Sequence, residues 1–402
     1  MDTHSPHWSE IWKSILSHPQ MILARPAVNL FLLKYLKKFK VQKVDGQLIV
    51  HSHLPPLNSK AYSRFINQHL LSKASRLSHA QVGLTNACPQ NCEYCYNKNR
   101  TGKTMETGQI IQLIKDLKSL GIFWLGFTGG EPLLNKDIVK ITESAGDDCT
   151  IKLFTTGCTL TPRLAKDLQQ AGLLYVSVSL DHWEAEIHDR VRRYEGAFKT
   201  ALKAIKIFKD LGNVHVGVSA VLSKNMLQNQ ETEQFLEFLI SLGVHEAWLS
   251  ETKPSLDKFW NPDLVINEKE RLALVALQDR YNKEGKITVN YLGHFEGREY
   301  FGCNAGHKMI YIDAFGEVSP CVFTPITMGN IRQESIQEIY ARMRNHFPSE
   351  ESCFINKNYQ LLQKYSHNSQ PLYLSDCLAM LQEVQFGAYS KFFQLHYGRE
   401  RT

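Results

Sequence analysis

The strongest constraint on the fold is a regular alternation of strand-like and helix-like segments that begins near Gln81. Short apolar runs are separated by longer segments that have the apolar spacing of amphipathic helices. The predicted strands cover residues 81–85, 123–127, 151–155, 174–180, 214–222 and 245–249. The predicted helices between them lie near residues 106–119, 134–145, 162–171, 196–211 and 230–242. This order predicts an α/β fold with a parallel sheet and right-handed crossovers, which either stays open or curls into a partial barrel.

The flanking segments predict further parts of the chain. At 402 residues, the length suggests two or three domains. We expect an N-terminal helical extension (1–79), a core (80–251), a bridging segment (252–300) and a second domain that is stabilised by a bound metal (301–402). The bridging segment is expected to contain one helix, near residues 267–283.

Within the extension, helices are expected near 7–16, 26–39 and 61–71, and one short strand at 44–50. Residues 28–40 are apolar on one side and basic on the other. Docking of this helix onto the main domain is the preferred interpretation, because amphipathic helices usually pack internally. A peripheral contact with a membrane or lipid, or with an acidic partner, is the alternative.

Composition excludes several classes of protein. Apolar residues make up 43% of the chain, too many for a disordered protein. The chain contains no apolar run of bilayer length, and its first twenty residues are charged without an apolar stretch, so we expect a cytoplasmic protein. The net charge of +6 is spread along the chain without a basic and aromatic patch, so no nucleic-acid partner is expected.

The nine cysteines are more informative, because without a signal peptide they indicate metal binding or catalysis rather than disulfides. Cys88, Cys92 and Cys95 follow the first predicted strand with the spacing C-x3-C-x2-C. Three thiolates on one loop can hold a 4Fe-4S cubane and leave one iron open, and an open position indicates chemistry. A zinc knuckle with a fourth ligand elsewhere is the structural alternative.

This triplet resembles the cluster-binding loop of the radical S-adenosylmethionine (radical SAM) superfamily. The resemblance implies a partial (β/α)6 TIM-like barrel in which Cys88, Cys92 and Cys95 ligate a 4Fe-4S cluster whose open iron binds SAM. It also implies that reductive cleavage of SAM gives a 5′-deoxyadenosyl radical, which abstracts hydrogen from a substrate. Tyr94 matches the aromatic position that backs the adenine.

The next motif lies one strand further along the chain. Gly129-Gly130-Glu131-Pro132 follows the second predicted strand and resembles the GGEP motif of the same family. The two glycines let backbone approach the ligand closely. Glu131 is expected to accept a charge-assisted hydrogen bond from the SAM ammonium group.

Two more segments resemble SAM-binding positions of this family. Ser179 and Asp181 end the fourth predicted strand at the ribose- and carboxylate-contacting position, on one face of the strand if the alternation continues. Arg192 lies in a segment that resembles HDxxR and is expected to bind the SAM carboxylate through its forked donors. Arg193 stands where the family usually has Gly, which leaves the choice between the two arginines open.

The C-terminal cysteines resemble the opening half of the SPASM and Twitch domains. Cys303 is followed by Gly316 and Cys321 with the spacing G-x4-C, but the dense cysteine run of a full SPASM domain is absent. The resemblance implies one auxiliary 4Fe-4S cluster held by Cys303, Cys321, Cys353 and Cys377. If the last two are not ligands, an open iron binds substrate; zinc is the alternative metal.

The resemblance leaves the substrate open. We expect a peptide or protein substrate that is cross-linked, oxidised or epimerised, because SPASM and Twitch relatives often act on peptides. A small molecule or lipid in cofactor or natural-product biosynthesis is the alternative. A non-catalytic iron–sulfur electron-transfer protein is a third class, but such a protein has no need of a GGEP motif. A reductase, flavodoxin or ferredoxin is expected to supply the electron.

Overall fold

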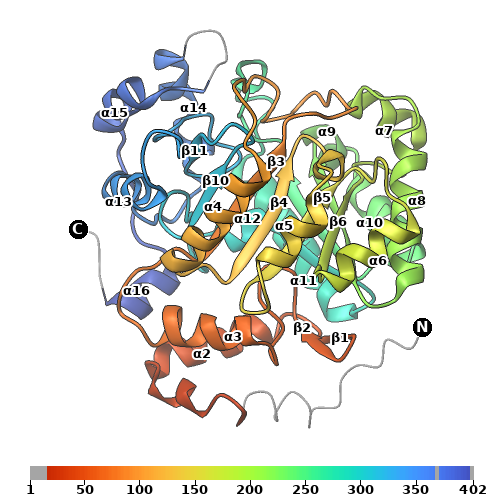
Figure 1. The fold of residues 1–402 in the computed structure, drawn as a ribbon, viewed down its shortest axis with the longest axis horizontal. Helices are drawn as coiled ribbons and strands as arrows, with labels where there is room; N and C mark the ends of the chain where they lie inside the picture. The colour runs from red at the N-terminus through yellow and green to blue at the C-terminus, as the bar shows by residue number, and fades with distance from the viewer. Residues whose placement is uncertain (1–15, 367–370, 399–402) are drawn as a thin grey trace.

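The computed structural model describes residues 16–366 and 371–398, which are built around one curled sheet (Figure 1). The sheet order in this part of the chain is β11-β10-β3-β4-β5-β6-β7-β8-β9, and the strands from β10 through β3 to β9 are parallel. The six predicted strands are observed with small changes at their ends: β3 (His79–Thr85), β4 (Trp124–Gly129), β5 (Thr150–Thr155), β6 (Tyr175–Ser179), β7 (His215–Leu222) and β8 (Glu246–Glu251). The predicted parallel α/β fold is therefore confirmed.

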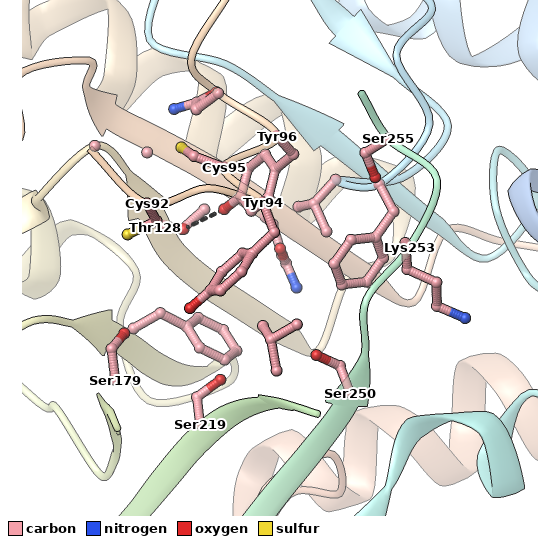
Figure 2. A pocket seen from close by; sticks show the side chains of 18 of the residues that line it. Cys92, Tyr94, Cys95, Tyr96, Thr128, Ser179, Ser219, Ser250, Lys253 and Ser255 are labelled. Atoms are coloured by element: carbon pink, nitrogen blue, oxygen red, sulfur yellow. Dashed lines mark hydrogen bonds between the residues drawn. The ribbon is translucent and has the colours of Figure 1, made fainter. Parts of the chain in front are cut away.

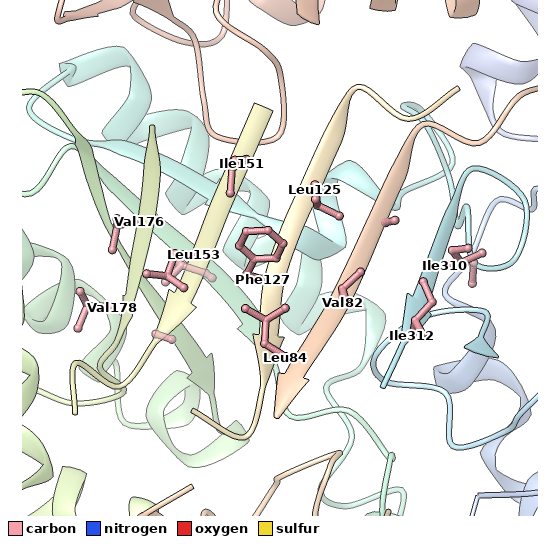
Figure 3. Close-up of a cluster of buried hydrophobic side chains, with 14 of the residues drawn as sticks. Val82, Leu84, Leu125, Phe127, Ile151, Leu153, Val176, Val178, Ile310 and Ile312 are labelled. Carbon is pink, nitrogen blue, oxygen red and sulfur yellow. The ribbon is translucent and has the colours of Figure 1, made fainter. Parts of the chain in front are cut away.

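Helices cover the outer face of this sheet. The five predicted helices correspond to α4 (Thr107–Leu120), α5 (Ile138–Ser144), α6 (Pro162–Gln170), α8 (Ala197–Leu211) and α10 (Glu231–Ser241). Shorter helices that were not predicted separately stand in the connections: η3 (Pro132–Leu134), α7 (Ala185–Arg192) and α9 (Lys224–Gln228). Every second strand residue, such as Leu125 and Phe127 on β4, points outward into the core that these helices complete (Figure 3). The residues between them point into the barrel.

The edges of the sheet differ from the prediction. The segment 252–300 contains η4 (Asp257–Phe259), α11 (Glu268–Glu284), β9 (Thr288–Tyr291) and α12 (Leu292–Phe295), and β9 pairs in parallel with β8. At the other edge, β10 (Met309–Ile312) pairs in parallel with β3 and forms an antiparallel hairpin with β11 (Val318–Ser319). The predicted boundaries at 251 and 300 therefore divide one continuous sheet, because strands distant in sequence complete both of its edges.

The N-terminal extension packs across the amino-terminal end of the barrel. It contains η1 (Pro19–Leu23), α2 (Pro26–Leu36), β1 (Gln42–Val44), β2 (Gln47–Ile49), α3 (Lys60–Phe65) and the π-helical turn η2 (Ile66–Leu70). The single strand expected at 44–50 is a hairpin that turns at Asp45-Gly46. The helix expected at 7–16 lies, apart from its last residue, outside the described residues.

The amphipathic helix α2 docks onto the main body, which confirms the preferred interpretation. Its buried residues Val28, Leu32 and Tyr35 share an apolar cluster with Phe392 and Phe393 of the C-terminal helix α16 (Lys391–Tyr397). Figure 1 shows α2 and α16 side by side below the barrel, and α13 (Ile336–His346), α14 (Phe354–Tyr365) and α15 (Leu374–Glu383) grouped at its upper left. Within the described residues, no helix is both long and apolar enough to cross a membrane.

Candidate active site

A cavity of about 460 Å³ lies at the carboxyl ends of the central strands (Figure 2). Hydroxyl-bearing residues reach it from five strands: Thr128 on β4, Thr155 on β5, Ser179 on β6, Ser219 on β7 and Ser250 on β8. These strands deliver their last inward-facing residues to one place because parallel strands end at the same edge. The residues predicted after the first, second and fourth strands, such as Cys88, Gly129 and Ser179, line this same cavity.

The cysteine loop that follows β3 forms one side of this cavity. Cys88, Cys92 and Cys95 all line it, with Cys92 buried and the other two half-buried. Burial raises the pKa of the Cys88 thiol to about 12, and it also raises the pKa values of Cys92 and Cys95. The structure thus brings the three predicted cluster ligands together.

The loop is fixed from both sides. The backbone N–H groups of Asn91 and Glu93 donate to the carbonyls of Arg192 and Val191, at 3.1 and 3.2 Å. At its end, the buried Arg100 forms an ion pair with Asp313.

A buried network connects the loop to the end of β6. The Tyr94 hydroxyl donates to Asp181 Oδ2 at 2.5 Å, and Arg192 Nε donates to the same oxygen at 2.7 Å. The Val221 N–H donates to Asp181 Oδ1 at 2.9 Å. Burial by itself would raise the pKa of Asp181, but the Arg192 charge and these hydrogen bonds hold it below the usual value.

This network changes the role expected for Asp181. The residue does not line the cavity, whereas Ser179 and Arg192 do. The strand β6 ends at Ser179, so the alternation does not carry Asp181 to the same face. Asp181 orients Tyr94 and Arg192, and it does not present its carboxylate to a ligand.

The structure also separates the two arginines. Arg192 is buried, its guanidinium lies 5.6 Å from the centre of the Tyr94 ring, and its Nη1 lies 3.8 Å from Cys92 Sγ. Arg193 adopts φ 49° at the end of α7, is exposed, and pairs with Glu93 at 3.4 Å. The left-handed conformation at 193 is one that Gly adopts without strain. Of the two, only Arg192 lines the cavity.

The GGEP segment departs most from expectation. Glu131 is fully buried and does not line the cavity. Its Oε1 accepts from Thr155 Oγ1 at 2.6 Å and from the Leu133 N–H at 3.0 Å, while its Oε2 accepts from the Thr156 N–H at 2.6 Å and from Thr156 Oγ1 at 2.5 Å. Burial raises the pKa of Glu131 despite these donors. The carboxylate therefore ties the end of β5 to the turn after β4, and the expected contact with a SAM ammonium group is not supported.

Gly129 and Gly130 both line the cavity, and here the turn after β4 lies very close to the cysteine loop. A Cβ atom on Gly130 would lie 2.3 Å from the Ala87 carbonyl oxygen, and Gly129 has φ 120°. The N–H groups of Gly130 and Glu131 donate to the carbonyls of Thr85 and Ala87, each at 2.7 Å. Glycine is required here so that the turn can lie directly against the cysteine loop.

A second group of cysteines lies beside the first. Cys303, Cys321 and Cys353 come from the segment after α12, the loop after β11 and the start of α14. Contact with Cys353, together with burial, raises the pKa of Cys303 well above its usual value, and Cys321 also contributes to this shift. Burial raises the pKa of Cys321 to about 12.

Cys377 does not belong to this group. It is buried on α15, and its Sγ lies 3.3 Å from the Met328 thioether sulfur. Burial alone raises its pKa, with no contribution from another cysteine. The predicted four-cysteine set is thus reduced to three, because α15 packs this thiol into the apolar core.

Charged side chains lie beside the second cysteine group. Lys253, which follows β8, lies 3.3 Å from Cys353 Sγ, 3.2 Å from Glu251 and 3.6 Å from Glu296. Burial would lower the pKa of Lys253, but Cys353 and the two carboxylates raise it well above its usual value. Burial, with Cys353, raises the pKa of Glu296 to about 8. The 460 Å³ cavity is lined by Cys321, Lys253 and Glu296 as well as by the first cysteine triplet.

These residues fit iron–sulfur clusters better than a single metal ion. Among residues 16–366 and 371–398, no three His, Cys, Asp or Glu side chains converge on a point where one ion would bind. Each thiolate of a cubane binds a different iron, so the ligands surround the group instead of converging. Each group of three cysteines can therefore ligate three irons of a cluster and leave the fourth iron for a further ligand.

Several cavity residues were not predicted from sequence. Ser219, Ser250, Lys253 and Glu296 lie after or near the ends of strands, and period-2 alternation applied to every strand end would have found the serines. His53 reaches the cavity from the N-terminal extension, and its ring stacks 3.6 Å from that of Trp248. No local sequence signal places residue 53 inside a barrel that begins at residue 79.

A curled parallel sheet whose carboxyl edge carries two cysteine groups defines an iron–sulfur enzyme of the partial-barrel class. Comparison with protein families agrees with this. The model described as the radical SAM superfamily matches residues 82–239, and that of the SPASM iron–sulfur cluster-binding domain matches residues 303–360. Residues 82–239 are thus a radical SAM domain and residues 303–360 a SPASM-type domain, so the chain is a radical SAM-type enzyme that uses a 4Fe-4S cluster and SAM.

Individual relatives give the same result. The chain is 25% identical over 280 residues to the AdoMet-dependent heme synthase of Methanosarcina barkeri, a match that covers 64% of this chain and 80% of that protein. It is 31% identical over 258 residues to the PqqA peptide cyclase of Bradyrhizobium diazoefficiens, covering 59% and 64% of the two chains. Its fold is similar to that of Streptococcus suis SuiB bound to precursor peptide SuiA, with a TM-score of 0.58, 15% identity and 79% coverage of each chain.

Proposed function

We propose that this enzyme modifies a peptide or protein by abstracting one hydrogen atom at the 460 Å³ cavity. The observation that carries the proposal is that all three cysteines of the first group and Cys321 of the second group line this same cavity. When bound, the cluster and SAM supply reductive SAM cleavage and hydrogen abstraction. A second cluster on the same cavity would accept the electron that remains after an oxidative change, or would bind the substrate directly.

In this proposal, Cys88, Cys92 and Cys95 hold the SAM cluster. Arg192 binds the SAM carboxylate, because it is the buried forked donor of the cavity and is aligned by Asp181. Tyr94 backs the adenine. The backbone at Gly129-Gly130 and the hydroxyl of Ser179 complete the SAM contacts.

The second cluster is assigned to Cys303, Cys321 and Cys353. All three fall inside the matched SPASM segment, whereas Cys377 falls outside it. Three ligands leave one iron of this cluster free for a group from the substrate. Lys253 and Glu296 form an ion pair that lines the same cavity, and this pair would hold or move a proton there.

A peptide substrate is supported by the relatives, among which are a PqqA peptide cyclase and a structure of SuiB bound to a precursor peptide. The heme synthase relative represents the small-molecule alternative. A small reductase, flavodoxin or ferredoxin of the cytoplasm is proposed as the electron donor.

Mass spectrometry of a deletion strain tests the substrate class. The deletion strain is complemented with the wild-type gene or with Cys92→Ala, and peptide, metabolite and lipid fractions are compared. We expect a peptide whose mass changes only with the wild-type gene. A metabolite or lipid that depends on the wild-type gene, with all peptides unchanged, would refute the peptide substrate.

A further inference from the structure

A second cavity, of about 110 Å³, lies beneath the barrel, between the N-terminal extension and α16. Figure 1 shows α2, α3 and α16 gathered in this region. Its lining is mostly aromatic and aliphatic, and includes Leu32, Tyr35, Phe65, Phe123, Phe301 and Phe393. We call it the lower cavity. It shares His53 and Met309 with the active-site cavity, so the two lie on either side of these residues.

The lining also includes Ser78, Asn304 and four histidines, and Lys308 is the one Lys, Arg, Asp or Glu among the described residues that line the cavity. Lys308 precedes β10, lines the lower cavity and is only 8% exposed. Among the described residues its Nζ has no hydrogen-bond partner, and its one ring contact is with Tyr397, at 5.5 Å from the ring centre.

No described carboxylate balances this charge. The neighbour whose charge affects Lys308 is Arg344, which is itself positive, so burial and Arg344 lower the pKa of Lys308 to about 7. A buried cation without a counter-ion is costly to a folded protein. An anionic group from outside the chain would satisfy it.

The surface around the lower cavity is also unusual. Ten large hydrophobic residues are exposed in the described part of the chain, and five of them lie between residues 16 and 33. Ile22 and Leu23 are 83% and 80% exposed, and their neighbour Met21 lines the lower cavity. Exposed apolar residues close in sequence to residues of an apolar cavity are typical of a surface that binds an apolar group.

We propose that the lower cavity binds a medium-chain carboxylate, with its carboxylate on Lys308 Nζ and its alkyl chain among the surrounding rings. The volume holds roughly seven to eleven water-sized groups, which corresponds to a chain of about eight carbons. The charge of Lys308 selects an anionic head, and the aromatic and aliphatic side chains that form most of the lining favour an alkyl body. This site is distinct from the SAM cavity and does not depend on which substrate that cavity accepts.

Isothermal titration calorimetry on the full-length, cluster-reconstituted enzyme tests this assignment. The probes are octanoate, 1-octanol and octyl phosphate, which share one chain and differ in the head group. Octanoate is expected to bind about tenfold or more tightly than 1-octanol, because a hydrogen bond to a charged group is worth that factor. Octyl phosphate is expected to bind more weakly than octanoate.

Two variants test whether Lys308 is the residue that binds the carboxylate of octanoate. In Lys308→Met, octanoate affinity is expected to fall at least about tenfold, to the level of 1-octanol, while 1-octanol binding stays unchanged. Lys391→Met, an exposed lysine on the neighbouring α16, is the matched control and keeps wild-type binding. Circular dichroism confirms that each variant is folded.

Three results would overturn the proposal. Octanoate that binds no better than 1-octanol to the wild-type enzyme would show that no charged head is recognised. Undiminished octanoate binding in folded Lys308→Met would place the ligand elsewhere. Tighter binding of octyl phosphate would show that the site takes a phosphate head group instead of a carboxylate. None of these outcomes depends on SAM turnover, so each can be distinguished from a failure of the proposed function.

Discussion

Replacing Glu131 by Gln separates two roles that sequence and structure assign to the GGEP motif. The resemblance predicts direct contact with the SAM ammonium group, whereas the structure places both carboxylate oxygens on Thr155, Thr156 and Leu133. The substitution keeps the size of the side chain and replaces one acceptor oxygen by an NH2 group. The threonine hydroxyls can rotate to adapt, but the backbone N–H groups cannot.

The loss of stability expected for Glu131→Gln follows from these hydrogen bonds. If the NH2 group takes the Oε2 position, the Thr156 N–H loses its acceptor inside a fully buried site. Loss of a hydrogen bond to a charged group, together with a buried donor left unsatisfied, costs about 3–5 kcal/mol. For a chain of 402 residues this corresponds to a melting temperature lower by about 5 °C.

Two assays distinguish the roles. Thermal unfolding measures the stability loss, and equilibrium dialysis with labelled SAM on reconstituted enzyme measures the dissociation constant. We expect a lower melting temperature and a SAM affinity within about threefold of wild type, because Glu131 does not line the cavity. Glu143→Gln, an exposed substitution on α5, is the control and is expected to change neither quantity. An unchanged melting temperature with SAM bound at least about tenfold more weakly would refute this reasoning and restore the direct contact.

Three further outcomes are expected. Cys92→Ala removes about four irons per chain and abolishes 5′-deoxyadenosine formation, measured by iron assay and chromatography; 5′-deoxyadenosine formed by this variant would contradict its assignment. Cys321→Ala also loses about four irons but keeps SAM cleavage, whereas Cys377→Ala keeps all of its iron. The three-cysteine set would be rejected if Cys321→Ala held as much iron as wild type, or if Cys377→Ala lost iron. Lys308→Met is expected to raise the melting temperature below about pH 7, because the folded wild-type protein keeps a costly buried ammonium there. Between about pH 7 and 10 this gain shrinks, because wild-type Lys308 loses its proton on folding and is then buried as a neutral amine. A melting temperature that is equal or lower in Lys308→Met throughout this range would show that the ammonium is stabilised inside the protein.

Local patterns were sufficient for the central part of the molecule. Short apolar runs placed the strands from β3 to β8, because these strands are almost wholly buried, and apolar spacing of period 3.6 placed their helices, because each helix buries one face. The spacing of Cys88, Cys92 and Cys95 needed no tertiary information, since a loop of eight residues keeps its thiols close in any conformation that binds one cluster.

Contacts between distant segments could not be predicted from local sequence patterns. β9 and β10 join opposite edges of the sheet, and His53 enters the barrel from the extension, through pairings that no local period encodes. Tertiary packing also turned Glu131 and Asp181 away from the cavity.

The cysteines show the same division. The sequence assigns Cys303, Cys321, Cys353 and Cys377 to one cluster, but a motif supports only the first pair and leaves the last two open. Only the packing of α14 and α15 distinguishes them, because it places Cys353 beside Cys303 and buries Cys377 against Met328. The chain alone therefore determined the fold class and the first chemical step. The folded structure decided which side chains meet, because long-range packing follows from the complementarity of surfaces that are far apart in the sequence.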